Sequence, residues 1–144
     1  EAGELPGRAP RALLDEPTEF PEAGEIPRAT LALAARLYGN WTSASAARRL
    51  RRMAALSVGQ ARAELRQAAA QSRVDRQQRG ARSRATVEAI SVRGQGPRRR
   101  ALVVTRERII APDLPPEGRR YRVTAAELER RPDGWVISRW APQP

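Results

Sequence analysis

The sequence lacks three residue types that carry much of enzyme chemistry. Cysteine, histidine and lysine are absent, and all 27 positive charges are arginine. Without cysteine there is no disulfide or thiolate chemistry, and without histidine as well the usual zinc ligands are missing. General acid–base catalysis is left with carboxylates and tyrosines. We therefore predict a protein that is not an enzyme and that uses no cofactor and no metal.

Aromatic residues and long apolar runs are also scarce. The aromatic fraction is 4%, so we expect an aliphatic, alanine-based core. The longest apolar runs, such as residues 101–104, fall far short of the roughly 20 residues that a membrane-spanning helix needs. The chain begins with Glu1 and not with methionine. We expect that a signal peptide or a single membrane anchor has been removed and that the domain lies on the extracytoplasmic side of the cell membrane.

The charge is strongly uneven along the chain. The net charge is +11, but residues 1–25 carry seven acids against two arginines, a net of −5, and the remainder carries 25 arginines against nine acids, a net of +16. Five prolines, at positions 6, 10, 17, 21 and 27, prevent a long helix in the same segment. We predict an acidic, proline-rich linker over residues 1–27, able to contact the basic domain that follows over residues 28–144.

Helical periodicity begins at Pro27, a residue suited to the first turn of a helix. Apolar residues recur every three or four positions from Leu31, and Gly39-Asn40 marks the end. Thr42 or Ser43 is expected to cap a second helix, 44–56, which turns arginines outward. Ser57 to Gln60 has the pattern of a capping box before a third helix. The inward residues expected for that third helix are Val58, Ala61, Leu65 and Ala68.

Beyond Arg84 the hydrophobic period changes to two. Four runs rich in β-branched residues, 86–93, 99–110, 119–128 and 135–140, predict strands. The sequence Arg131-Pro-Asp-Gly134 predicts the tight turn of the last hairpin. The expected fold is α+β, with three N-terminal helices packed on a curved four-stranded antiparallel sheet. Strict alternation on the last strand would place Trp135 and Ile137 on one face and Trp140 on the other.

Few residues suggest chemistry. Cross-strand ion pairs are the ordinary explanation for the acids on the strands, and Glu88 and Glu107, each at a strand centre, are the only pair to test for a role in a cavity. Asn40-Trp41-Thr42 matches a glycosylation sequon, but a helix-ending asparagine accounts for it. Two arginine clusters form a candidate patch for an anion or a partner: Arg48, Arg49, Arg51 and Arg52, with Arg98, Arg99 and Arg100. The candidate core anchors are Trp41, Leu50, Trp135 and Ile137.

Three stretches carry a resemblance to a known family: LAARLYGNWTSASAARRLRRMAAL (33–56), AISVRGQGPRRRALVVTRERI (89–109) and the terminal PDGWVISRWAP. Their order resembles the extracytoplasmic domains of conjugation proteins of the TcpC kind and of the VirB-eight-like assembly factors of type IV secretion systems. Mce-associated membrane proteins are similar too. The resemblance implies a cone-shaped fold like that of nuclear transport factor two, held behind an N-terminal anchor. It brings no catalytic residues.

The function predicted from these patterns is that of a non-catalytic, membrane-anchored scaffold domain of a conjugation or type IV secretion apparatus. Its partners would be other subunits of a membrane-associated complex, with self-association into a homo-oligomer possible. An arginine-rich protein that binds nucleic acid or an anionic surface is the alternative. A cone-fold enzyme or small-ligand receptor is a third possibility.

Overall fold

The computed structural model describes residues 24–74, 80–111 and 118–144. The predicted linker up to residue 23 lies outside the described residues. Three helices come first, α2 (Pro27–Gly39), α3 (Ala46–Ala55) and α4 (Gly59–Val74), with the short β1 (Trp41–Thr42) between the first two. The long strands follow: β2 (Arg82–Arg93), β3 (Arg98–Ile110), β4 (Arg120–Arg131) and β5 (Gly134–Pro142).

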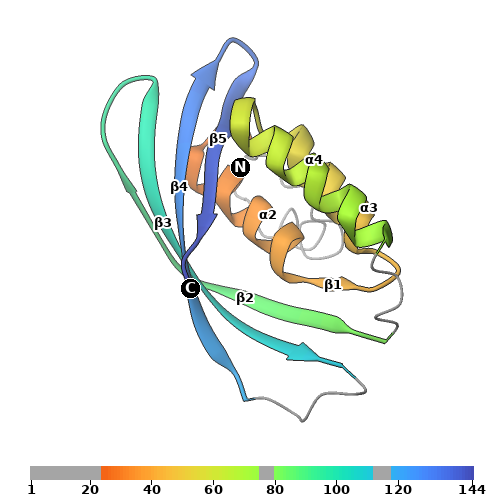
Figure 1. Ribbon diagram of the computed structural model, residues 1–144. Coiled ribbons are helices and arrows are strands. Elements are labelled where there is room, and N and C mark those ends of the chain that lie inside the picture. Colours follow the sequence, from red (N-terminus) through yellow and green to blue (C-terminus); the bar gives the residue numbers. More distant parts are fainter. Residues whose placement is uncertain (1–23, 75–79, 112–117) are drawn as a thin grey trace, which may run out of the picture.

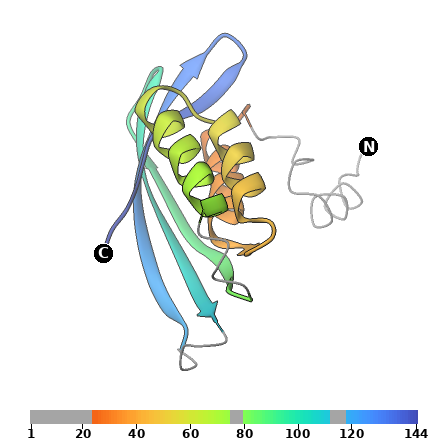
Figure 2. The same ribbon diagram turned by 45° about the vertical axis from the view of Figure 1, so that its right-hand side comes forward.

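The strands form one antiparallel sheet in the order β1-β2-β3-β4-β5, so that each strand pairs with its neighbours in sequence. Figure 1 shows the sheet curling around the helices, which lie in its concave side. The 45° turn of Figure 2 shows the same two layers from another side, with α4 and α3 outermost. The predicted α+β fold is confirmed. The sheet has a fifth strand because residues 41–42 pair with Arg82 and Ser83.

Helix α2 is the innermost helix on the concave side of the sheet. Pro27 occupies its first turn as predicted, and Asn40 is its C-terminal cap. Seven of its residues are buried, which agrees with an apolar surface over most of its circumference. Gly39 has another role than a left-handed cap. A Cβ at this position would lie 2.5 Å from the Cβ of Ala85, so the glycine allows α2 to approach β2.

The first turn before α3 is closed by a reciprocal pair of side chains. The backbone N–H of Ser45 donates to Thr42 Oγ1 (3.2 Å), and the N–H of Thr42 donates to Ser45 Oγ (2.9 Å). The prediction that Thr42 or Ser43 caps this helix is wrong, because the N-cap is Ser45 and no side chain caps the first turn; Thr42 instead closes the turn that precedes it. The predicted capping box at Ser57 is wrong. Its hydroxyl donates back to the carbonyl of Met53 (2.9 Å), and Gln60 bonds Glu64 instead.

Helix α4 presents one alanine and leucine stripe to the core. Ala61, Leu65 and Ala69 are buried at a spacing of four residues. Ala68, which was predicted to point inward, is exposed. The prediction is wrong by one position, because it places the last inward residue three positions after Leu65 and not four. None of the helices among the described residues combines the length and the hydropathy needed to cross a lipid bilayer.

A β-bulge decides where the C-terminal tryptophans point. Glu127 is paired with Arg139 and the next residue, Leu128, with Ile137, so Ser138 is the extra residue on β5. The bulge restores the inward direction for Trp140, which is buried together with Trp135 and Ile137. The predicted division of the two tryptophans between opposite faces is wrong. All three side chains belong to the core beneath the helices.

Both tryptophans make specific ring contacts. Trp140 meets Tyr38 of α2 edge to face, with ring centroids 5.7 Å apart. The guanidinium of Arg99 lies 5.0 Å above the ring of Trp135, within the range of a cation–π contact. The terminal strand therefore joins the sheet, the central helix and the β2–β3 hairpin.

Candidate functional site

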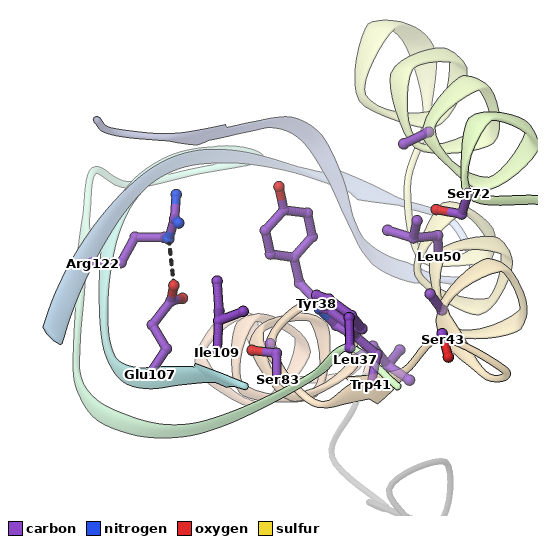
Figure 3. Close-up of a pocket in the computed structure, with 14 residues that line it drawn as sticks. Leu37, Tyr38, Trp41, Ser43, Leu50, Ser72, Ser83, Glu107, Ile109 and Arg122 are labelled. Atoms are coloured by element: carbon purple, nitrogen blue, oxygen red, sulfur yellow. Dashed lines mark hydrogen bonds and ion pairs between the residues drawn. The ribbon is translucent and has the colours of Figure 1, made fainter. Parts of the chain in front are cut away.

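The candidate site is a cleft of about 320 Å³ on the concave side of the sheet, next to the C-terminal end of α2. It lies between the C-terminal end of α2, the helices α3 and α4, and strands β2, β3 and β4. Figure 3 shows its residues as sticks. The apolar part of its lining includes Leu37, Trp41, Leu50 and Ile109. The polar part includes Tyr38, Ser83, Glu107 and Arg122.

An ion pair lies on the sheet side of the cleft. Arg122 Nε donates to Glu107 Oε1 at 3.0 Å, and Arg120 Nε lies 3.9 Å from the same oxygen. The Glu107 side chain is only 7% exposed, whereas that of Arg122 is 25% exposed. Both residues alternate with outward neighbours on β3 and β4, and this alternation turns them into the cone. Glu107 is thus both a cavity residue and half of a cross-strand ion pair.

Tyr38 reaches into the same cleft from the last turn of α2 (Figure 3). Burial raises the pKa of its hydroxyl above the ordinary value, the positive charge of Arg122 lowers it, and the charge of Glu107 raises it further. The net shift is upward, so at neutral pH the phenol keeps its proton and can donate a hydrogen bond. The cleft therefore offers hydrogen-bond donors, while the carboxylate it contains is already held by arginine.

Glu88, the other acid singled out from the sequence, is not in the cleft. It sits at a bulge in β2, where the register shifts between Val87 and Ala89. Its carboxylate lies 3.7 Å from Arg106 Nε and accepts a hydrogen bond from Thr86. The structure therefore does not bring Glu88 and Glu107 into one site.

Asn40 is engaged with the backbone of β2. Its side-chain Nδ2 donates to the carbonyl of Ala85 (3.0 Å), and the N–H of Ala85 donates to its Oδ1 (3.0 Å). Nδ2 also donates to the carbonyl of Arg36 at the end of α2. The side-chain amide of Asn40 thus pairs with the β2 backbone as a strand residue would, one position before β1 begins. This agrees with the prediction of a helix-ending asparagine.

The four arginines predicted as a patch on α3 do not act alike. Arg48 and Arg51 are exposed, and Arg52 is partly buried. Arg49 turns back onto α2, where it donates to the carbonyls of Leu37 and Arg36. These carbonyls lie in the last turn of α2, where Asn40 already donates to that of Arg36, so Arg49 adds a second side chain to the C-terminal cap. Burial lowers the pKa of Arg49, and the charges of Arg52, Arg48 and Arg36 lower it further.

The second predicted cluster lies at the β2–β3 hairpin, away from α3 (Figures 1 and 2). Arg98 and Arg100 are exposed there. Arg99 instead donates to the carbonyl of Gly96 and covers Trp135. The two clusters therefore do not form one continuous field.

The candidate core anchors occupy different environments. Trp135 and Ile137 are in the buried cluster, and Leu50 packs against that cluster while partly buried. Trp41 is partly exposed on β1 and lines the cleft. A two-residue edge strand turns its ring toward the cleft mouth and not into the core.

Sequence reasoning missed an apolar patch on the convex face of the sheet. Its exposed members are Leu102 (48%), Val123 (38%) and Tyr121 (65%). The register places Val104 opposite Val123 and Leu102 opposite Ala125, so these residues lie side by side. We call these five residues the convex patch. A signal was available, because 101–104 is apolar at every position and a strand of that kind is apolar on both faces.

Comparison with known proteins gives no match by sequence: neither a family model nor a curated protein matches the chain. Among the described residues, no cluster of three or more carboxylates is arranged to hold a metal ion.

Solved structures with the same fold are found at low sequence identity. The VirB8 protein of Agrobacterium tumefaciens is 12% identical, with a TM-score of 0.62 over 98% of this chain and 96% of that one. An NTF2-like protein with a cystatin-like fold from Novosphingobium aromaticivorans is 14% identical, with a TM-score of 0.54 over 96% and 90%. The intermembrane-space region of the chloroplast protein ARC6 is 15% identical, with a TM-score of 0.51 over 96% and 97%. At these identities the likeness establishes the fold, and the predicted VirB-eight-like, cone-shaped fold is confirmed.

Proposed function

We propose that this domain is a non-catalytic scaffold of a membrane-associated complex, of the conjugation or type IV secretion kind, and that it docks a partner subunit on the convex patch. The observation that carries the proposal is the exposure of Leu102, Tyr121 and Val123 on an open sheet face. Contiguous exposed apolar side chains rimmed by polar residues are typical of protein–protein interfaces. The likeness to VirB8 supports the choice of apparatus.

The charges around the convex patch indicate which surface charge a partner would need. The outward-facing rim carries Arg93, Arg100, Arg106 and Arg139 beside Glu88 and Glu127. Arginines outnumber acids, so a second copy stacked face to face would bring like charges together. A partner with an apolar centre and an acidic rim fits better. We place this docking on the extracytoplasmic side of the membrane, with the domain held by an N-terminal anchor.

The cleft supports a binding role more than a catalytic one. Catalysis by Glu107 as a general base needs a carboxylate free to accept a proton, but Arg122 and Arg120 both lie against it. Tyr38 keeps its proton at neutral pH, as shown above. We therefore propose that the cone is not an active site.

Site-specific photocrosslinking in the native host tests the docking face. A benzoylphenylalanine at position 102 or 121 is expected to form an adduct with one identified subunit of acidic surface, and the same group at the exposed Gln95 of the β2–β3 hairpin is the control. Val123→Asp should reduce the adduct several-fold. Because Val123 is on the surface, we expect it to change the unfolding free energy by less than about 1 kcal/mol. An adduct equal at position 95, or one with a second copy of the chain, contradicts the proposal.

An anionic-surface or nucleic-acid binder is the second candidate. It is favoured by the exposed arginines of α3 and α4, which have no carboxylate partner among the described residues. Binding to duplex DNA should then weaken steeply with salt. The double substitution Arg48→Gln with Arg51→Gln should flatten the dependence of log affinity on log salt. No binding at about 50 mM salt excludes this candidate.

A further inference from the structure

The outer side of the helix pair α3–α4 contains a groove of about 320 Å³. Its floor and edges are alanines, and its walls carry Arg51, Arg62 and Arg66. We call this feature the arginine groove. The three arginines are exposed, and the small side chains between them leave room for another segment of backbone to lie close to the helices.

The positive charge of the arginine groove is not neutralised within the described residues. Among the described residues all the ion pairs lie on the sheet and use Glu88, Glu107, Glu127 and Glu129. On α3 and α4 the single acid is Glu64, which accepts a hydrogen bond from Gln60. The groove therefore lacks an acidic partner, although five arginines lie on or beside it: Arg48, Arg51, Arg52, Arg62 and Arg66.

The start of the described chain lies close to one end of this groove. The N–H of Trp135 donates to the carbonyl of Gly24 (2.6 Å), and the N–H of Ile137 donates to the carbonyl of Leu56 (2.9 Å). Both bonds use the free edge of β5, and positions 135 and 137 are separated by about 7 Å along a strand. Leu56 directly follows Ala55, which lines the groove. The segment preceding Gly24 thus begins beside the α3–α4 turn.

That segment has the complementary charge. Residues 13–23 carry Asp15, Glu16, Glu19 and Glu22 and no arginine, and they also hold Leu13, Leu14 and Phe20. Eight residues of extended chain reach roughly 26 Å, and the stretch of helix from residue 62 to residue 70 is roughly 12 Å long. The acids of this segment can therefore reach every arginine of the groove.

We propose that residues 13–23 of the same chain dock in the arginine groove and neutralise it. The arginine groove and the convex patch share no residues, so docking of residues 13–23 in the groove does not depend on the proposed scaffold function. Each exposed ion pair is weak and screened by salt, but tethering raises the effective concentration of the segment to about the millimolar range. Docking shields the arginine groove from other anionic partners until residues 13–23 are displaced.

The absence of cysteine makes a direct test simple. The single substitution Thr18→Cys allows a nitroxide to be attached to the full-length chain, and paramagnetic broadening is then measured on the backbone amides. At about 20 mM salt, amides of residues 51–55 and 62–70 should lose more than about half of their intensity, and about 0.5 M salt should restore it because the Debye length falls to a few ångströms. A mixture of nitroxide-labelled and isotope-labelled chains should show no such broadening if docking is within one chain.

Two sets of variants complete the test. Neutralising the segment with Asp15→Asn, Glu16→Gln, Glu19→Gln and Glu22→Gln should abolish the broadening without touching the folded domain. Replacing Arg51, Arg62 and Arg66 by glutamate should do the same, whereas the matched change of Arg84, Arg93 and Arg98 to glutamate, equal in net charge, should leave it intact. Broadening centred on Leu102 and Val123, broadening only in the mixture, or none at low salt would overturn the inference.

Discussion

Glu107 and Arg122 face each other inside the cone, with Arg122 Nε 3.0 Å from Glu107 Oε1. Burial of a side chain that is only 7% exposed removes most of its hydration, and the ion pair with the Arg122 guanidinium offsets that loss. The pair therefore joins β3 to β4 at the point where the helices no longer fill the cone.

We predict that Glu107→Ala destabilises the domain by about 3 kcal/mol, because it leaves the charge of Arg122 without its partner in the cleft. The double substitution Glu107→Leu with Arg122→Leu should be much less harmful, since no isolated charge remains. Unfolding in urea, followed by tryptophan fluorescence, measures both.

The exposed pair of Glu127 and Arg139 is the control for this experiment. Its atoms are 3.6 Å apart, and the side chains are 47% and 61% exposed. Glu127→Ala should change the unfolding free energy by less than about 1 kcal/mol. If Glu107→Ala is no more harmful than Glu127→Ala, the buried pair does not have the structural role assigned to it.

Gly39→Ala should destabilise the contact between α2 and β2. The added Cβ would meet the Cβ of Ala85 at 2.5 Å, with backbone on both sides that has little freedom to move. Overpacking of this kind costs about 1–3 kcal/mol, although alanine is the better helix former. Thermal unfolding measures the loss.

Ala85→Gly provides the matching test of that contact. Combined with Gly39→Ala, it removes the atom that the new methyl group meets, and we expect the double variant to recover most of the lost stability. Gly118→Ala is a useful comparison, because nothing lies within 4 Å of a Cβ at Gly118 and its φ is not in the left-handed region. If Gly39→Ala lowers the stability of the domain equally with Ala85 and with Gly at position 85, the contact between positions 39 and 85 is not the cause of the loss.

The elements could be predicted from sequence because their signals are local. Helix periodicity from Leu31, the period of two beyond Arg84 and the turn ending at Gly134 each depend on neighbouring residues. The structure has these elements almost where they were expected. The short β1 was missed because two residues carry no period.

The site residues depend on packing between distant segments, which local patterns do not contain. Nothing in the sequence near Ser138 signals a bulge, yet the bulge decides the direction of Trp140. In the same way, the use of Arg49 as a cap for α2 depends on the crossing of two helices. Among the charged residues, Glu107 was singled out by its position at a strand centre, but its partner Arg122 was not.

The stability of the domain should fall at alkaline pH because of Tyr38. Burial raises the pKa of this phenol, so the folded state keeps the proton to a higher pH than the unfolded chain, whose tyrosines have a pKa of about 10. The unfolded state then binds fewer protons above that pH, and the unfolding free energy decreases as pH rises. The stabilisation is complete below about pH 10 and is lost between the unfolded and folded pKa values. Tyr38→Phe should remove this alkaline decrease.

The pKa itself can be read from the ultraviolet absorbance of phenolate. The chain has two tyrosines, so Tyr121→Phe leaves Tyr38 as the only phenol that titrates. Its midpoint should lie above about 10 in the folded protein and return to about 10 in concentrated urea. A further substitution, Arg122→Gln, removes the charge that lowers this pKa and should move the folded midpoint upward. A folded midpoint at or below the midpoint in urea would show that the Tyr38 hydroxyl is not buried in the cleft.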